Sequence, residues 1–256
     1  MSSSYYRPPP VSNTMRMRRA LAVAGCGVLT VGLSACQSTQ QESAKIGREG
    51  RQLVAAAGNL RLGAVNHSVR ASDVTLLSSS GRTAVAVRLS SSSSAPQAAI
   101  PVLVEVSGAG AKQLYTNATG GLETSLQQMS QLTPHGQAWW VDDQVLTSQS
   151  ASGVRVRVGS GRVPRTSFSP STLTSTGLHL TQQSGLSVLA GELVNHTAKA
   201  LGKVPVYAVA LAGRRVVAAG RAVVGAPSRS TSPFQIFLVG NPAGARLELS
   251  AAPAAG

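Results

Sequence analysis

The sequence predicts an all-β protein, because short alternating apolar runs, separated by Ser and Gly, fill most of the chain after residue 60. Runs of about four to eight residues with period-two alternation are typical of strands, and no sustained helical period of about 3.6 residues interrupts them. The runs form two series, within residues 58–158 and 178–250, and the two series resemble one another. We therefore predict two tandem small immunoglobulin-like β-sandwich domains.

Six candidate strands lie in the first predicted domain, residues 58–158. In the last of them, Val154–Val158, Val alternates with Arg, which predicts one buried and one solvated face. The Ser-rich stretch from Ser90 to Gln97 has no such alternation and predicts a turn region. The six candidates are Val74–Leu77, Ala84–Leu89, Ile100–Val106, Gln113–Tyr115, Ala138–Leu146 and Val154–Val158.

Residues 159–177 are rich in Ser, Thr and Pro and lack alternation, so they predict a linker. The strand pattern then returns in the second predicted domain, residues 178–250. Because each domain has its own alternating strands, we expect each to fold alone. The candidate strands of the second domain are Leu178–Leu180, Leu186–Val194, Val204–Leu211, Arg215–Val224, Phe234–Val239 and Arg246–Leu249.

An internal repeat of about 100 residues relates the two domains. Ile100–Val106 aligns with Val204–Ala210, and each segment has Pro as its second residue, where a strand tolerates the missing donor. Later in each half comes a strand with aromatic residues, Trp139–Val141 in the first and Phe234–Phe237 in the second. The repeat predicts that these strands occupy equivalent positions.

The second half resembles the FxLYD family of small β-sandwich domains of bacterial envelope proteins. The resemblance rests on Gly191–Asn195, Val204–Val209, the turn at Gly220 and Phe234–Phe237, and it covers about 70 residues. The acidic residue that often follows the central aromatic in that family is missing here. The resemblance implies a sandwich fold, and it implies little about function.

The N-terminal region has the layout of an export signal. A basic segment, Arg16–Arg19, precedes an apolar run from Ala20 to Leu33, and no Asp or Glu occurs before Glu42. As a helix the run would reach roughly 21 Å, which is too short to span a bilayer and suits a signal peptide.

The apolar run ends in the residues Leu33, Ser34, Ala35 and Cys36. This motif resembles the lipobox of bacterial lipoproteins, in which a peptidase cleaves before the Cys and a diacylglycerol is attached to its sulfur. The resemblance implies a signal peptide at residues 1–35 and lipidation, for example with palmitate, at Cys36. The Ala, Arg and Ser bias of the chain resembles that of lipoproteins from high-GC Gram-positive bacteria.

Two alternatives remain open at the N-terminus. Val23–Cys26 also fits a lipobox, but only six residues separate Cys26 from Arg19, which is short for the apolar segment. An uncleaved signal anchor is the other reading, and Met1, Met15 and Met17 all remain open as the first residue. Because Cys26 and Cys36 are the only cysteines, the chain after Cys36 has no thiol for a disulfide or a metal site.

Charge gives little support for a membrane contact beyond the lipid. Four of the 23 Lys and Arg residues precede Cys36 and all nine acidic residues follow it, so the remaining chain carries +10. The predicted tether, residues 36–57, is nearly neutral, and the acyl chains would supply the anchoring to membrane lipid. The more basic second domain suits anionic wall polymers, and the Arg bias of a GC-rich genome explains its charge equally well. In an extracytoplasmic location we expect no nucleic-acid partner.

No catalytic or metal-binding constellation is present in the sequence. His67, His135, His179 and His196 are far apart, and none has a partner at ligand spacing, so we expect no metal or other cofactor. Asp142 and Asp143 are adjacent, but neighbours on a strand point to opposite faces and cannot form a facing carboxylate pair. We expect Trp140 in the core and the two Asp residues in a solvated turn.

The sequence therefore predicts a lipid-anchored extracytoplasmic protein of the cell membrane, without catalytic activity, that binds or scaffolds other envelope components. Two alternatives stay open: a divergent envelope hydrolase and a solute-binding lipoprotein of a transporter. The first would need a cluster of polar groups in one pocket. The second is usually built from alternating strands and helices, which this sequence lacks.

Overall fold

The computed structural model describes residues 59–166 and 168–253, and it confirms the all-β prediction. Every strand pairs in antiparallel register. Helical structure within the described residues is confined to three short 3₁₀ segments, Ala109–Ala111, Thr124–Leu126 and Pro170–Thr172. None of the helices in this part of the chain is long and apolar enough to cross a membrane.

We call β1 to β7 the first half and β8 to β14 the second half. The strands of the first half are β1 (Val69–Ser79), β2 (Arg82–Ser91), β3 (Gln97–Ser107), β4 (Gln113–Thr116), β5 (Gln128–Leu132), β6 (Gln137–Val145) and β7 (Gly153–Val158). Those of the second half are β8 (Leu173–Gln183), β9 (Leu186–Asn195), β10 (Leu201–Ala212), β11 (Arg215–Ala226), β12 (Thr231–Phe237), β13 (Val239–Gly240) and β14 (Arg246–Ala251).

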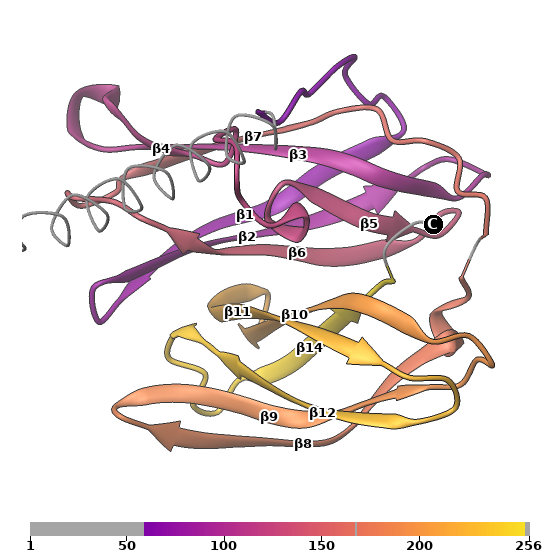
Figure 1. Cartoon of the computed structure of the whole chain (residues 1–256). Coiled ribbons are helices and arrows are strands. Elements are labelled where there is room, and N and C mark those ends of the chain that lie inside the picture. The colour runs from indigo at the N-terminus through magenta and orange to yellow at the C-terminus, as the bar shows by residue number, and fades with distance from the viewer. Residues whose placement is uncertain (1–58, 167, 254–256) are drawn as a thin grey trace, which may run out of the picture. The chain divides into compact units, whose positions relative to one another are not determined.

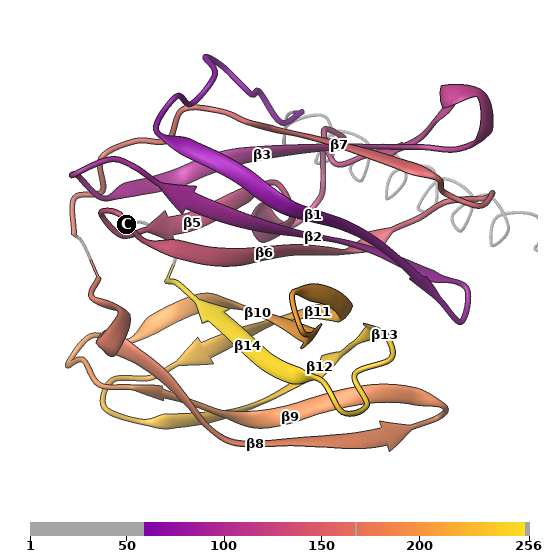
Figure 2. The same cartoon turned by 180° about the vertical axis from the view of Figure 1, so that it is seen from behind.

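The two halves have the same strand connectivity (Figures 1 and 2). In the first half one sheet has the order β1-β2-β6, and in the other sheet β3 pairs with both β4 and β7. In the second half one sheet has the order β8-β9-β12, and in the other sheet β10 pairs with both β11 and β14. Each half also has one strand without a counterpart in the other half. These strands are β5, which pairs with β3, and β13, which pairs with β11. This pairing agrees with the internal repeat, since β3 corresponds to β10 and β6 to β12.

The first hairpin of each half has the same two-residue turn. Ser80-Gly81 joins β1 to β2, and Ser184-Gly185 joins β8 to β9; all four residues have positive φ, between 51° and 77°. A turn with two positive φ angles matches the right-handed twist of the flanking strands, and Gly adopts it without a steric penalty. The local sequence Ser-Gly therefore sets both hairpins.

The two halves pack face to face within one compact unit of the chain (Figure 1). Because each half has two sheets, the sheets form four layers. The sheet β1-β2-β6 lies against the sheet β13-β11-β10-β14, with contacts of β6 to β10, β11 and β14. Both inner sheets are consequently covered on both faces. Such strands are expected to be apolar on both sides rather than alternating.

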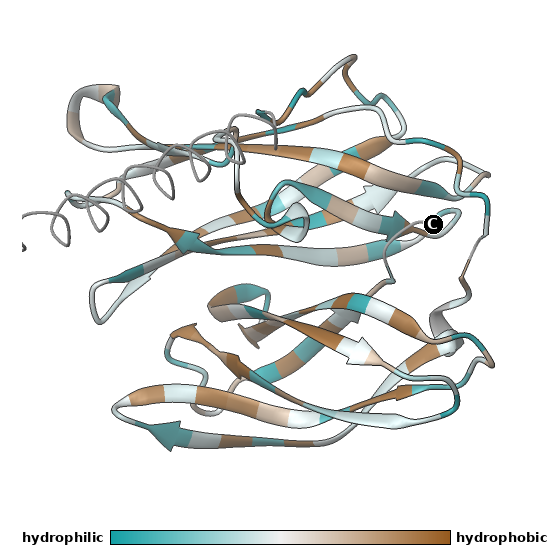
Figure 3. Cartoon of the chain, viewed as in Figure 1, coloured by the Kyte–Doolittle hydropathy of each residue, from teal (hydrophilic) through white to brown (hydrophobic). Residues whose placement is uncertain are grey.

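Strand β10 shows this two-sided burial. Val206, Ala208 and Ala210 belong to the core of the second half, whereas Tyr207 and Val209 belong to the cluster shared with the first half. The side chains of β14 also alternate between two faces, and the alternating colours of this strand in Figure 3 show the pattern. Its Leu residues pack on the core of the second half, while its polar residues face β6.

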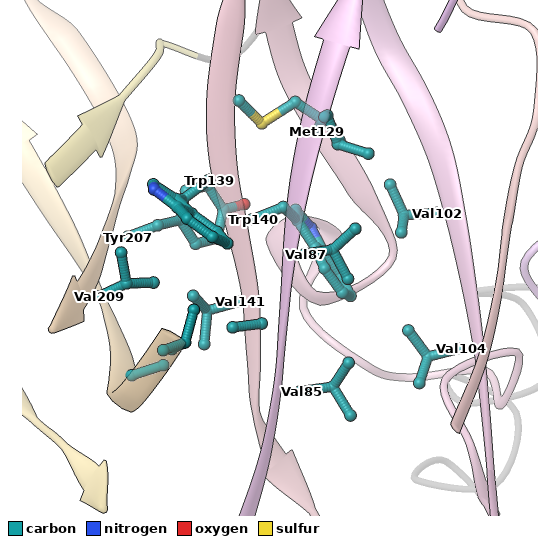
Figure 4. Packing of buried hydrophobic residues seen from close by; sticks show 14 of the residues in the cluster. Val85, Val87, Val102, Val104, Met129, Trp139, Trp140, Val141, Tyr207 and Val209 are labelled. Carbon is teal, nitrogen blue, oxygen red and sulfur yellow. The ribbon is translucent and has the colours of Figure 1, made fainter. Parts of the chain in front are cut away.

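Strand β6 is the counterpart of β10 in the first half. Trp140 is fully buried and lies on the side of Val102 and Val104 from β3, whereas Trp139 lies on the side of Tyr207 and Val209 (Figure 4). Successive side chains of a strand point to opposite faces, so β6 contributes to two hydrophobic layers. The expectation that Trp140 lies in the core is confirmed.

Eleven of the twelve candidate strands are present as single strands, whereas the predicted strand Phe234–Val239 divides into β12 and β13 of different sheets. Three further features differ from the sequence prediction. Strand β5 was not predicted, because its residues QMSQL mix polar and apolar types without clear alternation. Strand β8 begins at Leu173, inside the predicted linker, since Thr and Ser pair as readily as apolar residues on its exposed face. The preceding connection is also held in place, because the backbone of Arg162 exchanges two hydrogen bonds with Ala98 of β3.

Candidate functional site

The predicted lipidation site Cys36 and its recognition residues Leu33, Ser34 and Ala35 lie outside the described residues, as do the signal peptide and nearly all of the tether. The candidate histidines lie within them. His179 bonds the backbone oxygen of Gly177, and His196 bonds the hydroxyl of Thr174. Within residues 59–166 and 168–253, no group of three or more His, Cys, Asp or Glu side chains is arranged to hold a metal ion.

Asp142 and Asp143 lie within β6, and their expected location in a solvated turn is wrong. Asp142 is fully buried, and the side chain of Asp143 is only 10% exposed. The first half encloses the carboxylate of Asp142 beside Tyr115, and the second half covers the opposite face of β6 and removes solvent from Asp143. The two side chains do point to opposite faces, because each contacts a different half of the molecule.

Asp142 faces the first half, where Tyr115 of β4 donates a hydrogen bond of 2.7 Å to its Oδ2. The backbone N–H of Gln144 donates to its Oδ1. Burial raises the pKa of Asp142 to about 6, although these two hydrogen bonds act in the opposite direction. Burial also raises the pKa of Tyr115, with a further contribution from the nearby carboxylate, so the phenol stays protonated and remains the donor.

Asp143 faces the second half and contacts Arg221 of β11. The backbone N–H of Arg221 donates to Oδ2 of Asp143 at 3.1 Å, and the guanidinium Nε lies 3.5 Å from Oδ1. The same guanidinium donates from Nη1 to Glu123 at 2.7 Å and to the hydroxyl of Ser125. Since only 4% of the Arg221 side chain is exposed, a buried cation of the second half is held by two carboxylates of the first.

Burial and the partner charges act in opposite directions on the charged forms of this cluster. Burial raises the pKa of Asp143, and the positive charge of Arg221 offsets part of that effect. Burial alone would lower the pKa of Arg221, but Glu123 and Asp143 together raise it above its ordinary value. Beside the cluster, Tyr207 and Trp140, one from each half, both donate to the backbone oxygen of Ser125, at 2.9 and 3.0 Å.

A second polar contact joins the halves at β14. Trp139 donates from its indole Nε1 to Glu248 at 2.7 Å and from its backbone N–H to the hydroxyl of Ser250 at 2.9 Å. The guanidinium of Arg88 stacks over the Trp139 ring, 4.6 Å from its centroid. The hydrogen bond from the Trp139 indole is the main cause that lowers the pKa of Glu248, and the positive charges of Arg246 and Arg88 add to it.

A cavity of about 210 Å³ opens between the halves, away from the ionic cluster. It is bordered by β5 and the start of β6, by the connection before β8 together with its first residue, and by the last residues of β14 and the chain that follows. Gln131 of β5 lies in its wall and is 4% exposed. The side-chain amide of Gln131 has no hydrogen-bond partner among the described residues, which is a costly arrangement for a buried polar group.

Arg221 and Gln131 were not identified in the sequence analysis, and only Arg221 had a usable signal. It is the single charge inside the otherwise apolar and small-residue run Val216–Ala226 of β11, and a charge in a doubly buried strand requires a partner. Gln131 stands in a strand that was not predicted. Nothing in its neighbours indicates that its amide is buried.

No family model matches this chain, and no curated protein matches it. The functional argument therefore rests on the residues themselves. The buried ionisable groups are engaged with one another across the interface, whereas the cavity holds a polar group without a partner.

Proposed function

We propose that this chain is a lipid-anchored extracytoplasmic protein of the cell membrane that binds or scaffolds envelope components and does not catalyse a reaction. The observation that carries the proposal is the sequence Leu33-Ser34-Ala35-Cys36 at the end of a basic and then apolar N-terminal segment. Attachment of a diacylglycerol and a further acyl chain to Cys36 would hold the protein firmly, because two chains anchor where one is marginal.

The arrangement of the buried charges supports binding or scaffolding over catalysis. A general acid or nucleophile must reach a substrate, whereas Asp143 and Glu123 are held by Arg221, and Asp142 by Tyr115. These contacts join the two halves or fill the interior of one. They suit a protein that presents a fixed surface to a partner.

Anionic wall polymers are the partner class that the charge distribution favours. The second half carries exposed cations, and an excess of one charge sign attracts polyanions over distances of about one Debye length, roughly 8 Å at physiological salt. Envelope proteins remain the other partner class. The exposed cationic residues of the second half include Lys199, Lys203, Arg214, Arg215 and Arg229.

Metabolic labelling with a palmitate analogue in a bacterium that processes lipoproteins tests the lipid anchor. The two variants to compare are Cys36→Ala and Cys26→Ala. We expect Cys36→Ala to abolish labelling and to leave the unprocessed precursor, because the thioether needs that sulfur. Cys26→Ala should label and fractionate with membranes like the unaltered chain. Labelling of Cys36→Ala together with loss of labelling in Cys26→Ala would contradict the assignment of the lipidated residue, and labelling of neither chain would contradict the anchor itself.

A further inference from the structure

The cavity between the halves combines a small volume with a wall that lacks charge. Among the described residues that line it, none is acidic or basic. Apolar side chains from both halves, including Met129, Phe168 and Leu249, alternate with hydroxyl and amide groups. A site of this composition disfavours an ion, because no opposite charge would compensate for its desolvation. It suits a small neutral molecule with both apolar and hydrogen-bonding parts.

Gln131 supplies the polar group that such a molecule would meet. Its Nε2 and Oε1 atoms are both buried and both lack a hydrogen-bond partner among the described residues. Met129 and Gln131 are two residues apart on β5, point to the same face and both line the cavity. The terminal torsion of Gln is broad, so the amide of Gln131 can reorient beside the cavity without movement of the strand.

The neighbouring Gln127 shows how this chain satisfies an amide that serves only structure. Its Nε2 donates to the backbone oxygens of Asn117 and Thr119, at 2.8 and 3.0 Å. Asn117, which is fully buried, likewise uses all of its side-chain polar atoms in bonds to the backbone. Gln131 is therefore an exception among neighbours of the same chemical type, and the cavity beside it offers an explanation.

We propose that this cavity binds a small neutral molecule bearing an amide, such as a peptide-like group. The Nε2 of Gln131 donates to the ligand carbonyl, and its Oε1 accepts from the ligand N–H. The apolar walls from Phe168, Leu173 and Leu249 enclose the rest of the molecule. The inference rests on the binding role of the proposed function and is independent of the lipid anchor.

A titration of the full chain, purified in detergent and labelled with ¹⁵N, tests this pairing through the side-chain resonances of Gln131. The probes are N-acetyl-L-alaninamide and N-acetyl-L-alanine, which are nearly the same size and differ by an amide in place of a carboxylate. We expect saturable shifts with the neutral amide, and binding at least about tenfold weaker with the carboxylate, because the carboxylate brings an uncompensated charge into the cavity.

The variants Gln131→Met and Gln127→Met separate a binding amide from a structural one. Gln131→Met should weaken binding of the neutral amide about tenfold while raising Tm by about 2–4 °C, because the buried unpaired group is removed. Gln127→Met should lower Tm and leave binding unchanged. This opposite behaviour is expected only if the unpaired amide is retained for a ligand.

Absence of saturable shifts with N-acetyl-L-alaninamide, or equal shifts with the two probes, would overturn the proposal. A fall in Tm for Gln131→Met as large as that for Gln127→Met would also overturn it, since Gln131 would then be satisfied by water. The Cys36→Ala chain should bind the probe like the unaltered chain. If the unaltered chain is not acylated but binds the probe, the anchor alone is contradicted, and if it is acylated but does not bind the probe, the cavity alone is contradicted.

Discussion

Strands β6 and β12 occupy equivalent positions in the two halves, yet their burial differs. Along β12, buried Phe234 and Ile236 alternate with exposed residues, because one face of the sheet β8-β9-β12 is open to solvent. Along β6, four consecutive residues from Trp139 to Asp142 are buried, because the second half covers the other face. Equivalent strands therefore differ in pattern according to what packs outside their own sandwich.

We expect the largest loss of unfolding free energy from truncation of the matched aromatic residues of β6 and β12. The two variants to compare are Trp140→Ala and Phe234→Ala. Each creates a cavity in a core and should cost about 3–5 kcal/mol of unfolding free energy, with Trp140→Ala near the upper end. Trp140 is the larger residue, and its removal also deprives Ser125 of a hydrogen bond. Urea unfolding followed by circular dichroism measures both. A smaller effect for Trp140 than for Phe234 would contradict the placement of Trp140 in the core of the first half.

The ion pair between Asp143 and Arg221 links β6 to the second half, and β12 has no such contact among the described residues. The substitution Arg221→Met removes this ion pair. This substitution leaves the buried Asp143 and the partly exposed Glu123 without their cation, and we expect a loss of about 3 kcal/mol in unfolding free energy, mainly from Asp143. Arg246→Met is the matched control: its ion pair with Glu248 is exposed and should contribute less than about 1 kcal/mol. Equal effects of the two variants in urea unfolding would show that the buried cluster does not hold the halves together.

The smallest expected effect concerns the pH dependence of Asp142, which has no acidic counterpart on β12. Its pKa rises from 3.8 to about 6 in the folded state, so the folded protein binds a proton more tightly than the unfolded chain. Stability from this group is present below pH 4 and falls as the pH rises through 6, by about 2–3 kcal/mol in total. In Asp142→Asn this contribution should be lost from urea unfolding measured between pH 4 and 7, which leaves only the smaller decrease that comes from groups such as Asp143. A variant with the same pH profile as the unaltered chain would refute the buried position of this carboxylate.

The sequence predicted every strand with clear alternation, and its errors at Asp142 and Asp143 have two different physical causes. Periodicity reports the faces of a single sandwich, so it placed Trp140 correctly and misplaced Asp143, whose burial depends on the second half. Asp142 was misplaced because β6 continues where a turn was expected, and its side chain points into the first half. The unbroken apolar run of β10, from Val204 to Leu211, was the available sign of a doubly covered sheet. The cavity could not be predicted, because it depends on how segments more than 100 residues apart meet.

The two halves share one hydrophobic layer, and this shared layer affects the order in which the chain can fold. The segment 178–256, which the sequence predicts to fold alone, lacks the first residues of β8 and would expose Tyr207 and Val209 to water. The first half faces the converse problem during synthesis, because the contacts of Trp139 require the last strand of the chain. Roughly 100 residues separate β6 from the end of β14, which corresponds to about 5–20 s of translation. For that interval a broad apolar sheet face has no covering partner, and transiently exposed apolar surface of this kind is prone to aggregation.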